Sequence, residues 1–355
     1  MTFRKFDCRN ENVLHFLNFS CWGVLFRRFH RKKIIFVINI GQKILLLQKL
    51  LLPLYSIFVY QICLTYINFS MKKRHLFLFL LVVTVNYMNA QQKVYKYGVG
   101  SYTVHLLSER QSEGNKEILI GATAEMMKQS IPDGTFPMAM NCFLIETGKE
   151  TILIDAGVGF GLFECIKMAG KKPEDIDAVY ITHLHGDHFG GLMQEGQKSF
   201  PNIKLYVSKA EFDYWISDKA KNADNARKVL EMYKDNLVLF EPGTFEKPYE
   251  EIKGIKGIAT YGHTPGHTCF LIESDNSKLF IWGDLTHAMA IQMPFPQVAV
   301  TYDVDPKMAV ETRKWVLEYL ETNKIPIAGM HIKFPAIGYL KQNPKQGYDF
   351  ELVTE

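Results

Sequence analysis

The chain has 355 residues, enough for two domains or one large one, and its 47% hydrophobic and 22% charged residues are typical of a folded globular protein. The net charge of +4 is unevenly distributed, because 13 of the 41 Lys and Arg but only 2 of the 37 Asp and Glu lie in residues 1–90. The other 28 basic and 35 acidic residues make residues 91–355 acidic, which argues against a nucleic-acid-binding surface.

The first ninety residues contain two segments of distinct character. Residues 50–70 are uncharged and long enough to cross a bilayer. Residues 71–90 have a basic start, a short apolar run and a cleavage point before Gln91, the pattern of a secretory signal peptide. Residues 1–70 are therefore either a membrane anchor or a gene-model extension ahead of a start at Met71, and we favour the extension. We expect residues 91–355 to form a periplasmic or secreted domain, with membrane contact only if residues 50–70 are retained.

Short apolar runs alternate with turn residues after Gln91 and predict strands over 102–107, 117–120, 141–146, 151–154, 178–181, 203–207, 255–261, 269–273, 278–282 and 325–328. Helices are expected over 160–169, 208–217, 223–233 and 306–321. Ser208 and Glu211 have the spacing of a capping box. Strands come first and last with helices between them. This order favours one α/β domain in which two sheets face each other and helices lie outside.

Residues able to bind metal follow several of these strands. His183, His185, Asp187 and His188 lie within six residues next to a glycine, and imidazole and carboxylate are the ligands that suit zinc and similar ions. Three more candidates follow later strands: His267, Asp284 and His331. Five histidines and two carboxylates on strand-end loops are what two adjacent metal ions require.

With its His-x-His-x-Asp-His run and its later His, Asp and His, the chain resembles the metallo-β-lactamase-fold hydrolase superfamily. The resemblance implies the four-layer αββα sandwich of that superfamily. It also implies two divalent ions, most simply zinc. His183, His185 and His267 would bind one ion, Asp187, His188 and His331 the other, and Asp284 would bridge them. A hydroxide bridging the ions would attack the substrate, and Asp187 would pass a proton to the leaving group.

Within that superfamily, residues 282–287, 291–296 and 329–335 are similar to the branch of methyl parathion hydrolase and N-acyl homoserine lactonases. That branch implies hydrolysis of a small, uncharged or weakly polar ester, lactone or phosphotriester. Small lactonases carry a catalytic Tyr three residues after the bridging Asp, and His287 stands there in this chain. His287 either donates a hydrogen bond to the substrate or packs. The alternatives are a β-lactam hydrolase and a non-catalytic, metal-stabilised binding protein; a homodimer is one assembly the sequence allows.

For some other residues the sequence predicts a structural role, and for others it leaves two roles open. We expect His105 to be structural, His263 to pack in its loop, and Cys142, Cys165 and Cys269 to be buried small hydrophobes. Asp155 either caps its own turn or orients a metal ligand. Six apolar residues form either a rim around the metals or ordinary loop packing: Phe136, Met138, Met289, Met293, Phe295 and Phe334.

Overall fold

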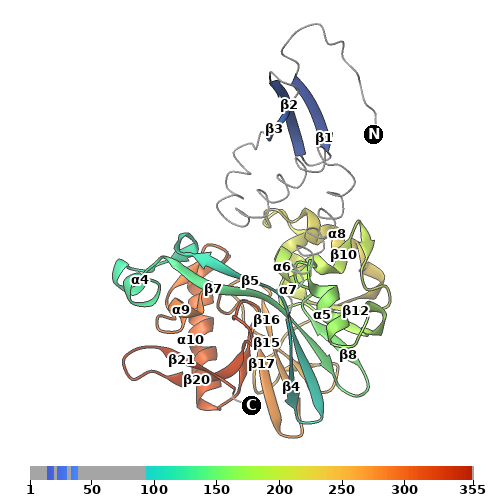
Figure 1. The fold of residues 1–355 in the computed structure, drawn as a ribbon. Helices are drawn as coiled ribbons and strands as arrows, with labels where there is room; N and C mark the ends of the chain where they lie inside the picture. Colours follow the sequence, from blue (N-terminus) through green and yellow to red (C-terminus); the bar gives the residue numbers. More distant parts are fainter. Residues whose placement is uncertain (1–13, 20–21, 30–32, 39–92, 354–355) are drawn as a thin grey trace. The chain divides into compact units, whose positions relative to one another are not determined.

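The computed structural model describes residues 14–19, 22–29, 33–38 and 93–353, and the chain divides into two compact units, Met1–Asn86 and Tyr87–Glu355 (Figure 1). In the first unit, β1 (Leu14–Phe19), β2 (Trp22–Phe29) and β3 (Lys33–Ile38) form an antiparallel sheet that the sequence did not predict. The predicted anchor and signal peptide lie outside the described residues. Among the described helices, none has the length and apolar character needed to cross a membrane.

The second unit is built on two seven-stranded sheets. The first has the order β13 (Leu237–Phe240), β12 (Lys204–Ser208), β9 (Ala178–Tyr180), β8 (Thr151–Ile154), β7 (Thr135–Glu146), β5 (Tyr102–Asn115), β4 (Lys93–Val99). The second has the order β14 (Tyr249–Glu250), β15 (Ile255–Ala259), β16 (Thr268–Ser274), β17 (Ser277–Ile281), β19 (Ile327–Ala328), β20 (Ile337–Gln342), β21 (Tyr348–Leu352). The edge strands β4, β13, β14 and β21 were not predicted, and neither was β20 beside β21.

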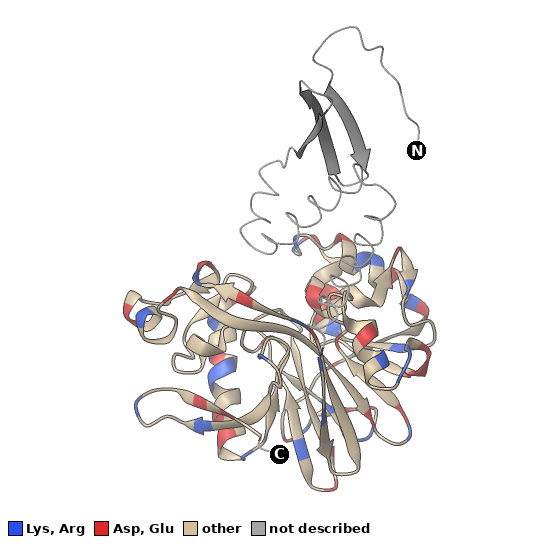
Figure 2. Cartoon of the chain, in the orientation of Figure 1, with Lys and Arg blue, Asp and Glu red and all other residues tan. Residues whose placement is uncertain are grey.

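The described helices of this unit are α4 (Ala124–Ser130), α5 (Leu162–Met168), α6 (Gly186–Phe189), α7 (Lys209–Ile216), α8 (Asp224–Met232), α9 (Met289–Gln292) and α10 (Pro306–Thr322). The outer face of the first sheet is covered by α5, α7 and α8, and that of the second by α10. Figure 1 shows α5 and α7 on one outer side of this unit and α10 on the other. In Figure 2 the charged residues of both signs lie mainly on the helices and near strand ends, whereas the middle parts of the strands are largely uncharged.

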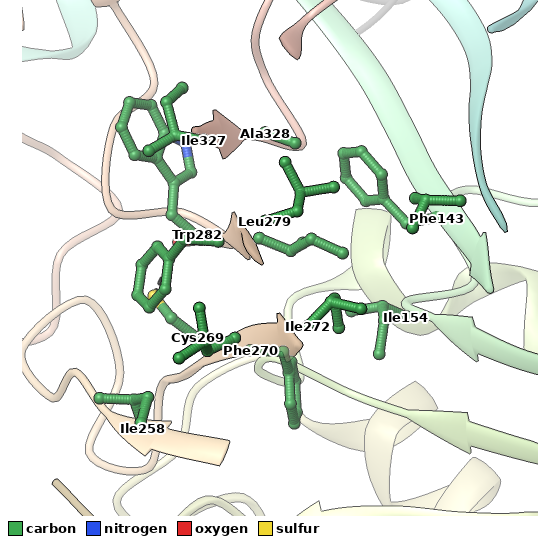
Figure 3. Packing of buried hydrophobic residues seen from close by; sticks show 14 of the residues in the cluster. Phe143, Ile154, Ile258, Cys269, Phe270, Ile272, Leu279, Trp282, Ile327 and Ala328 are labelled. Carbon is green, nitrogen blue, oxygen red and sulfur yellow. Dashed lines mark hydrogen bonds between the residues drawn. The ribbon is translucent and has the colours of Figure 1, made fainter. Parts of the chain in front are cut away.

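Two large hydrophobic cores hold these layers together. Between the sheets, Phe143 and Ile154 of the first sheet belong to the same core as Phe270 and Leu279 of the second (Figure 3). Each fully buried side chain of this size contributes about 1.5–3 kcal/mol, so the packing of the two sheets dominates the stability of the unit. A second core lies between the first sheet and the helices α5, α7 and α8. The predicted αββα sandwich is therefore confirmed.

Strand direction brings the candidate metal ligands to one edge. β8, β9 and β12 are parallel to one another, as are β17 and β19, and each of these strands ends just before a residue of interest. Asp155 follows β8, His183 comes shortly after β9, Asp284 follows β17 and His331 follows β19. Because carboxyl ends of parallel strands meet at one edge, loops far apart in the sequence converge there.

The hairpin of β5 and β7 is longer than the strands predicted from the sequence. Its length decides where several of the six apolar residues lie that the sequence left either as a rim or as loop packing. Its far end, with α4 and β6 (Leu119–Ile120), packs on α9 and on β18 (Ala299–Val300). In the predicted strand 117–120, the first residues form a short 3-10 helix, Lys116–Ile118. Phe136, Met293 and Phe295 are only 1%, 3% and 7% exposed, so they are core residues and not a rim. Met138, Met289 and Phe334 are partly buried against the cores.

Several smaller predictions can be compared with the structure directly. Cys142, Cys165 and Cys269 are buried free thiols, as predicted. His105 lies 2.8 Å from the Glu146 carboxylate on the neighbouring strand, which fits the predicted structural role. Ser208 caps α7 as predicted, because its side chain accepts from the Glu211 N–H. The Glu211 carboxylate binds other loops instead of completing the capping box, as described below.

Candidate metal centre

Three imidazole nitrogens converge at the edge of the sheets. His183 Nε2 lies 2.9 Å from His185 Nδ1 and 3.2 Å from His263 Nε2, and the latter two atoms are 2.9 Å apart. Ligand nitrogens around a tetrahedral zinc, each about 2.0–2.1 Å from the ion, are about 3.3 Å apart. The three nitrogens, with Asp284, are therefore close enough together to bind one cation.

A second group lies on the other side of Asp284. Asp187, His188 and His331 can offer ligand atoms within one site. Asp284 Oδ1 is 3.0 Å from His188 Nε2 and 3.1 Å from His331 Nε2, while Asp284 Oδ2 is 3.3 Å from His263 Nε2. One carboxylate therefore faces both groups, which is the arrangement expected of a bridging ligand.

Unpaired buried atoms test whether these residues fit metal ions. His188 Nε2, His331 Nε2 and Asp284 Oδ1 are buried without a hydrogen-bond partner among the described residues. The opposite ring nitrogens donate elsewhere: His188 Nδ1–H to Asp155 at 2.6 Å, and His331 Nδ1–H to the Ala139 carbonyl at 2.9 Å. Each Nε2 therefore points into the centre, where a bound cation would take the place of a proton. Leaving a buried polar atom unpaired costs about 1–3 kcal/mol, and a divalent cation would remove that cost. The residues fit.

The five clustered rings fall into two groups by protonation. Burial lowers the pKa of His183 and lowers that of His185 to about 3, so both rings are neutral at pH 7. Burial also acts to lower the pKa of His188 and His331, but Asp284 outweighs it and raises both. His263 behaves in the same way: burial lowers its pKa, but Asp284 and Asp303 together raise it to about 9. A cation bound at His263 would therefore displace a proton, which makes metal binding dependent on pH.

The structure corrects the prediction for His267. Its Nε2 accepts the Asp284 N–H at 3.0 Å, and its Nδ1–H donates to the Thr260 carbonyl at 3.0 Å, so neither nitrogen is available to a metal. His263, predicted to pack in the loop, lies in the cluster instead. Both residues are in one loop, and sequence spacing could not distinguish them. Only the fold distinguishes them: Gly262, with a φ of +128° and a close approach to Ala309, turns the chain so that His263 faces the cluster.

His287 is turned towards the carboxylate and away from solvent. Its Nε2 lies 2.8 Å from Asp284 Oδ2, its ring stacks on that of His331, and it is only 3% exposed. The sequence left two roles open for His287, and this placement fits holding Asp284 better than meeting a substrate.

Two further carboxylates orient the ligands. Asp155, in a left-handed conformation (φ +58°), accepts from His188 Nδ1–H and from the Thr182 N–H, so it supports the metal site. Asp303 accepts from His263 Nδ1–H at 2.8 Å and from the Val300 N–H at 2.9 Å. Such partners fix the tautomer and the direction of a ligand imidazole. Sequence reasoning missed Asp303, because only the fold brings it next to His263.

Glu211 joins two ligand-bearing loops. It is fully buried on α7, and its Oε1 accepts from the Leu184 N–H, next to His183 and His185, and from Trp215 Nε1–H. Its Oε2 accepts from the Thr264 hydroxyl and the Gly266 N–H, in the loop that carries His263. Burial raises the pKa of Glu211, and these four donors oppose that rise. The carboxylate thereby fixes the separation between the two loops.

We expect Asp303→Asn to weaken metal binding by about 10–100-fold, because an amide holds the His263 Nδ1–H less strongly than a carboxylate does. Zinc affinity can be measured by competition with a coloured chelator. Asp305→Asn is the matched control, since Asp305 caps α10 through the Met308 N–H and Asn caps equally well. Equal zinc affinity in the Asp303→Asn variant and the wild type would contradict the role given to Asp303.

Comparison with known proteins places this site in a family. The family model described as "Metallo-beta-lactamase superfamily" matches residues 136–321, more than half of the chain. The chain therefore belongs to the metallo-β-lactamase superfamily, and the resemblance stated from the sequence is confirmed.

Individual members of the superfamily are also similar to this chain. An N-acyl homoserine lactonase of Bacillus cereus is 27% identical over 178 residues, or 42% of this chain and 64% of the relative. A second N-acyl homoserine lactonase, of a Bacillus sp, is 28% identical over 162 residues, or 38% of this chain and 59% of the relative. The chain thus spans less than two thirds of the length of these two relatives.

Two crystal structures match most of the chain. AidC, described as a dizinc quorum-quenching lactonase, superimposes with a TM-score of 0.67 at 25% identity, covering 75% of this chain and 99% of AidC. The hydrolase AbOPH of the beta lactamase superfamily gives a TM-score of 0.65 at 27% identity, covering 74% of this chain and 98% of AbOPH.

Proposed function

We propose that this protein hydrolyses a lactone or a similar small ester, with two divalent metal ions, zinc in the first instance, as its cofactor. The observation that carries the proposal is Asp284, which lies between two groups of metal-binding side chains and faces both. A protein that used metal only for stability would not need one carboxylate that faces two groups of metal ligands. Nor would it need these groups to open towards the partly exposed carboxylate of Asp187.

The residues of this chain would have different roles at such a centre. Bound there, two zinc ions would supply an acidified water and a positive charge for the substrate oxygen. His183, His185 and His263 would hold one ion, and His188, His331 and Asp187 the other, with Asp284 shared. His267, His287, Asp155 and Asp303 orient these ligands. The ligand set proposed here replaces His267 by His263.

Asp187 is suited to moving a proton. It is 31% exposed, whereas the histidines and Asp284 around it are almost wholly buried. Burial raises its pKa, but His188 and His331 outweigh that effect and hold the pKa below its ordinary value. Asp187 is therefore ionised at neutral pH, and its carboxylate can accept a proton at the centre and deliver it to a departing alkoxide.

The relatives support a lactone as the first substrate to test. Two curated relatives are named N-acyl homoserine lactonases, and AidC was solved with a product of lactone opening. A signal peptide over residues 71–90 and export after cleavage before Gln91 remain part of the proposal, and mass spectrometry of the native N-terminus tests them.

A hydrolysis panel on the zinc-loaded protein tests the function. It contains aliphatic lactones, N-acyl homoserine lactones, aryl esters, a phosphotriester and β-lactams, each with and without a chelator. Chelator-sensitive opening of lactones or esters is the expected result. Turnover of β-lactams alone would favour the β-lactam hydrolase. Zinc-loaded protein that turns over no member of the panel would favour the binding protein.

A further inference from the structure

The turn that follows β18 is held firmly against the metal centre. The Thr301 N–H donates to the Ile118 carbonyl at 2.8 Å on one side. On the other, Asp303 binds His263, and the Val304 N–H donates to the His263 carbonyl at 2.9 Å. Residue 302 lies between these anchors, so its backbone position is fixed relative to the cluster of His183, His185 and His263.

Tyr302, the residue at that position, is exposed where its neighbours are buried. Its side chain is 49% exposed, whereas His287, His263 and Asp303 are at most 8% exposed. Its ring lies 5.7 Å, centroid to centroid, from the ring of His287. Burial and the nearby Asp187 carboxylate raise the pKa of the Tyr302 phenol, so the hydroxyl keeps its proton at neutral pH.

Several other donors of the centre are already committed. His188, His331 and His263 use their N–H groups on Asp155, Ala139 and Asp303. His287 directs Nε2 at Asp284 and is buried. Asp187 and Asp284 can only accept. A lactone or ester carbonyl gains negative charge as it is attacked, and stabilisation of that charge requires a donor facing the substrate.

We propose that Tyr302 contacts the substrate directly, its hydroxyl donating a hydrogen bond to a substrate oxygen and its ring packing on the substrate's apolar part. The inference rests on the proposed function and adds to it a residue that the sequence pattern did not indicate. The sequence offered His287 as a candidate for the hydrogen bond to the substrate. The inference assigns this hydrogen bond to Tyr302, fifteen positions later and on a different loop. Amphipathic aromatic side chains suit this dual contact, because one end is apolar and the other polar.

Tyr302→Phe, Tyr302→Ala and the control Tyr339→Phe test the inference in the zinc-loaded protein. Tyr339 is 40% exposed on β20, beside Tyr97, and its variant makes the same chemical change away from the centre. We expect Tyr302→Phe to lower kcat/KM for the best panel substrate by about 10–100-fold, mainly through kcat, because a hydrogen bond to developing charge is lost. Tyr302→Ala should also raise KM for substrates with longer acyl chains. Zinc content and Tm should match the wild type.

The outcomes separate the inference from the function it rests on. A Tyr302→Phe variant within twofold of the wild type in kcat/KM overturns the inference and leaves the hydrolase intact. Loss of activity together with loss of zinc overturns it too, because Tyr302 would then act by supporting the metal site. Wild-type protein that holds its zinc but hydrolyses nothing on the panel overturns the proposed function, and the inference with it.

Discussion

Replacing Asp284 with Asn is expected to lower kcat/KM for lactone or ester hydrolysis by about 10³-fold or more, because the one carboxylate that faces both groups of ligands becomes neutral. Asp284 lies within 3.5 Å of His183, His188, His263 and His331, and an amide cannot supply two anionic oxygens to two cations. Steady-state kinetics of the zinc-loaded variant would measure the effect, and circular dichroism would show whether the fold is retained.

An Asp→Asn substitution at an exposed position is the control, because it removes one negative charge from the protein without changing the metal centre. Asp213→Asn on α7 removes a carboxylate that, within the described part of the chain, pairs only with Lys209 at the surface. We expect that variant to keep wild-type kcat/KM. A folded Asp284→Asn protein that retained activity within tenfold of the wild type would show that the carboxylate does not bridge two catalytic ions.

His263→Ala and His267→Gln should differ in metal content. His263 Nε2 is part of the cluster with His183 and His185, so His263→Ala should bind one zinc fewer per chain and lose about 10²–10³-fold in kcat/KM. Both nitrogens of His267 are hydrogen-bonded within the protein. His267→Gln should therefore keep its zinc, and the loss of a buried hydrogen bond should cost about 1–3 kcal/mol of unfolding free energy.

Elemental analysis and thermal unfolding of the two variants, side by side, would measure both effects. The reverse result, with zinc lost from the His267 variant and kept by the His263 variant, would contradict the structure and restore the ligand set predicted from the sequence.

The parts of the site that could be predicted from the sequence are local ones. The run from His183 to His188 supplies four candidate ligands within one turn, so strand direction alone is enough to bring them together. The bounds of β8 agree with the prediction residue for residue, because its apolar run is short and bounded by turn residues. Ser208 was predicted as a cap for the same reason, since this cap depends on two residues only three positions apart, Ser208 and Glu211.

The parts that were missed depend on contacts between distant segments. His263 and His267 share one loop, and only the packing of Gly262 on α10 decides which of them faces the metals. Asp303 and Tyr302 reach the centre because β18 pairs with β6, a contact spanning about 180 residues that no local pattern encodes. Phe136 and Phe295 are buried by the extension of β5 and β7, so packing, the second of the two roles left open by the sequence, holds for them.

Counting the zinc ions bound per chain, by native mass spectrometry after reconstitution and removal of free metal, tests the central claim most directly. Two ions per chain is the predicted result, because two groups of ligands share Asp284. One ion would mean that Asp284 does not bridge, and no ion would mean that the clustered histidines are not a metal centre.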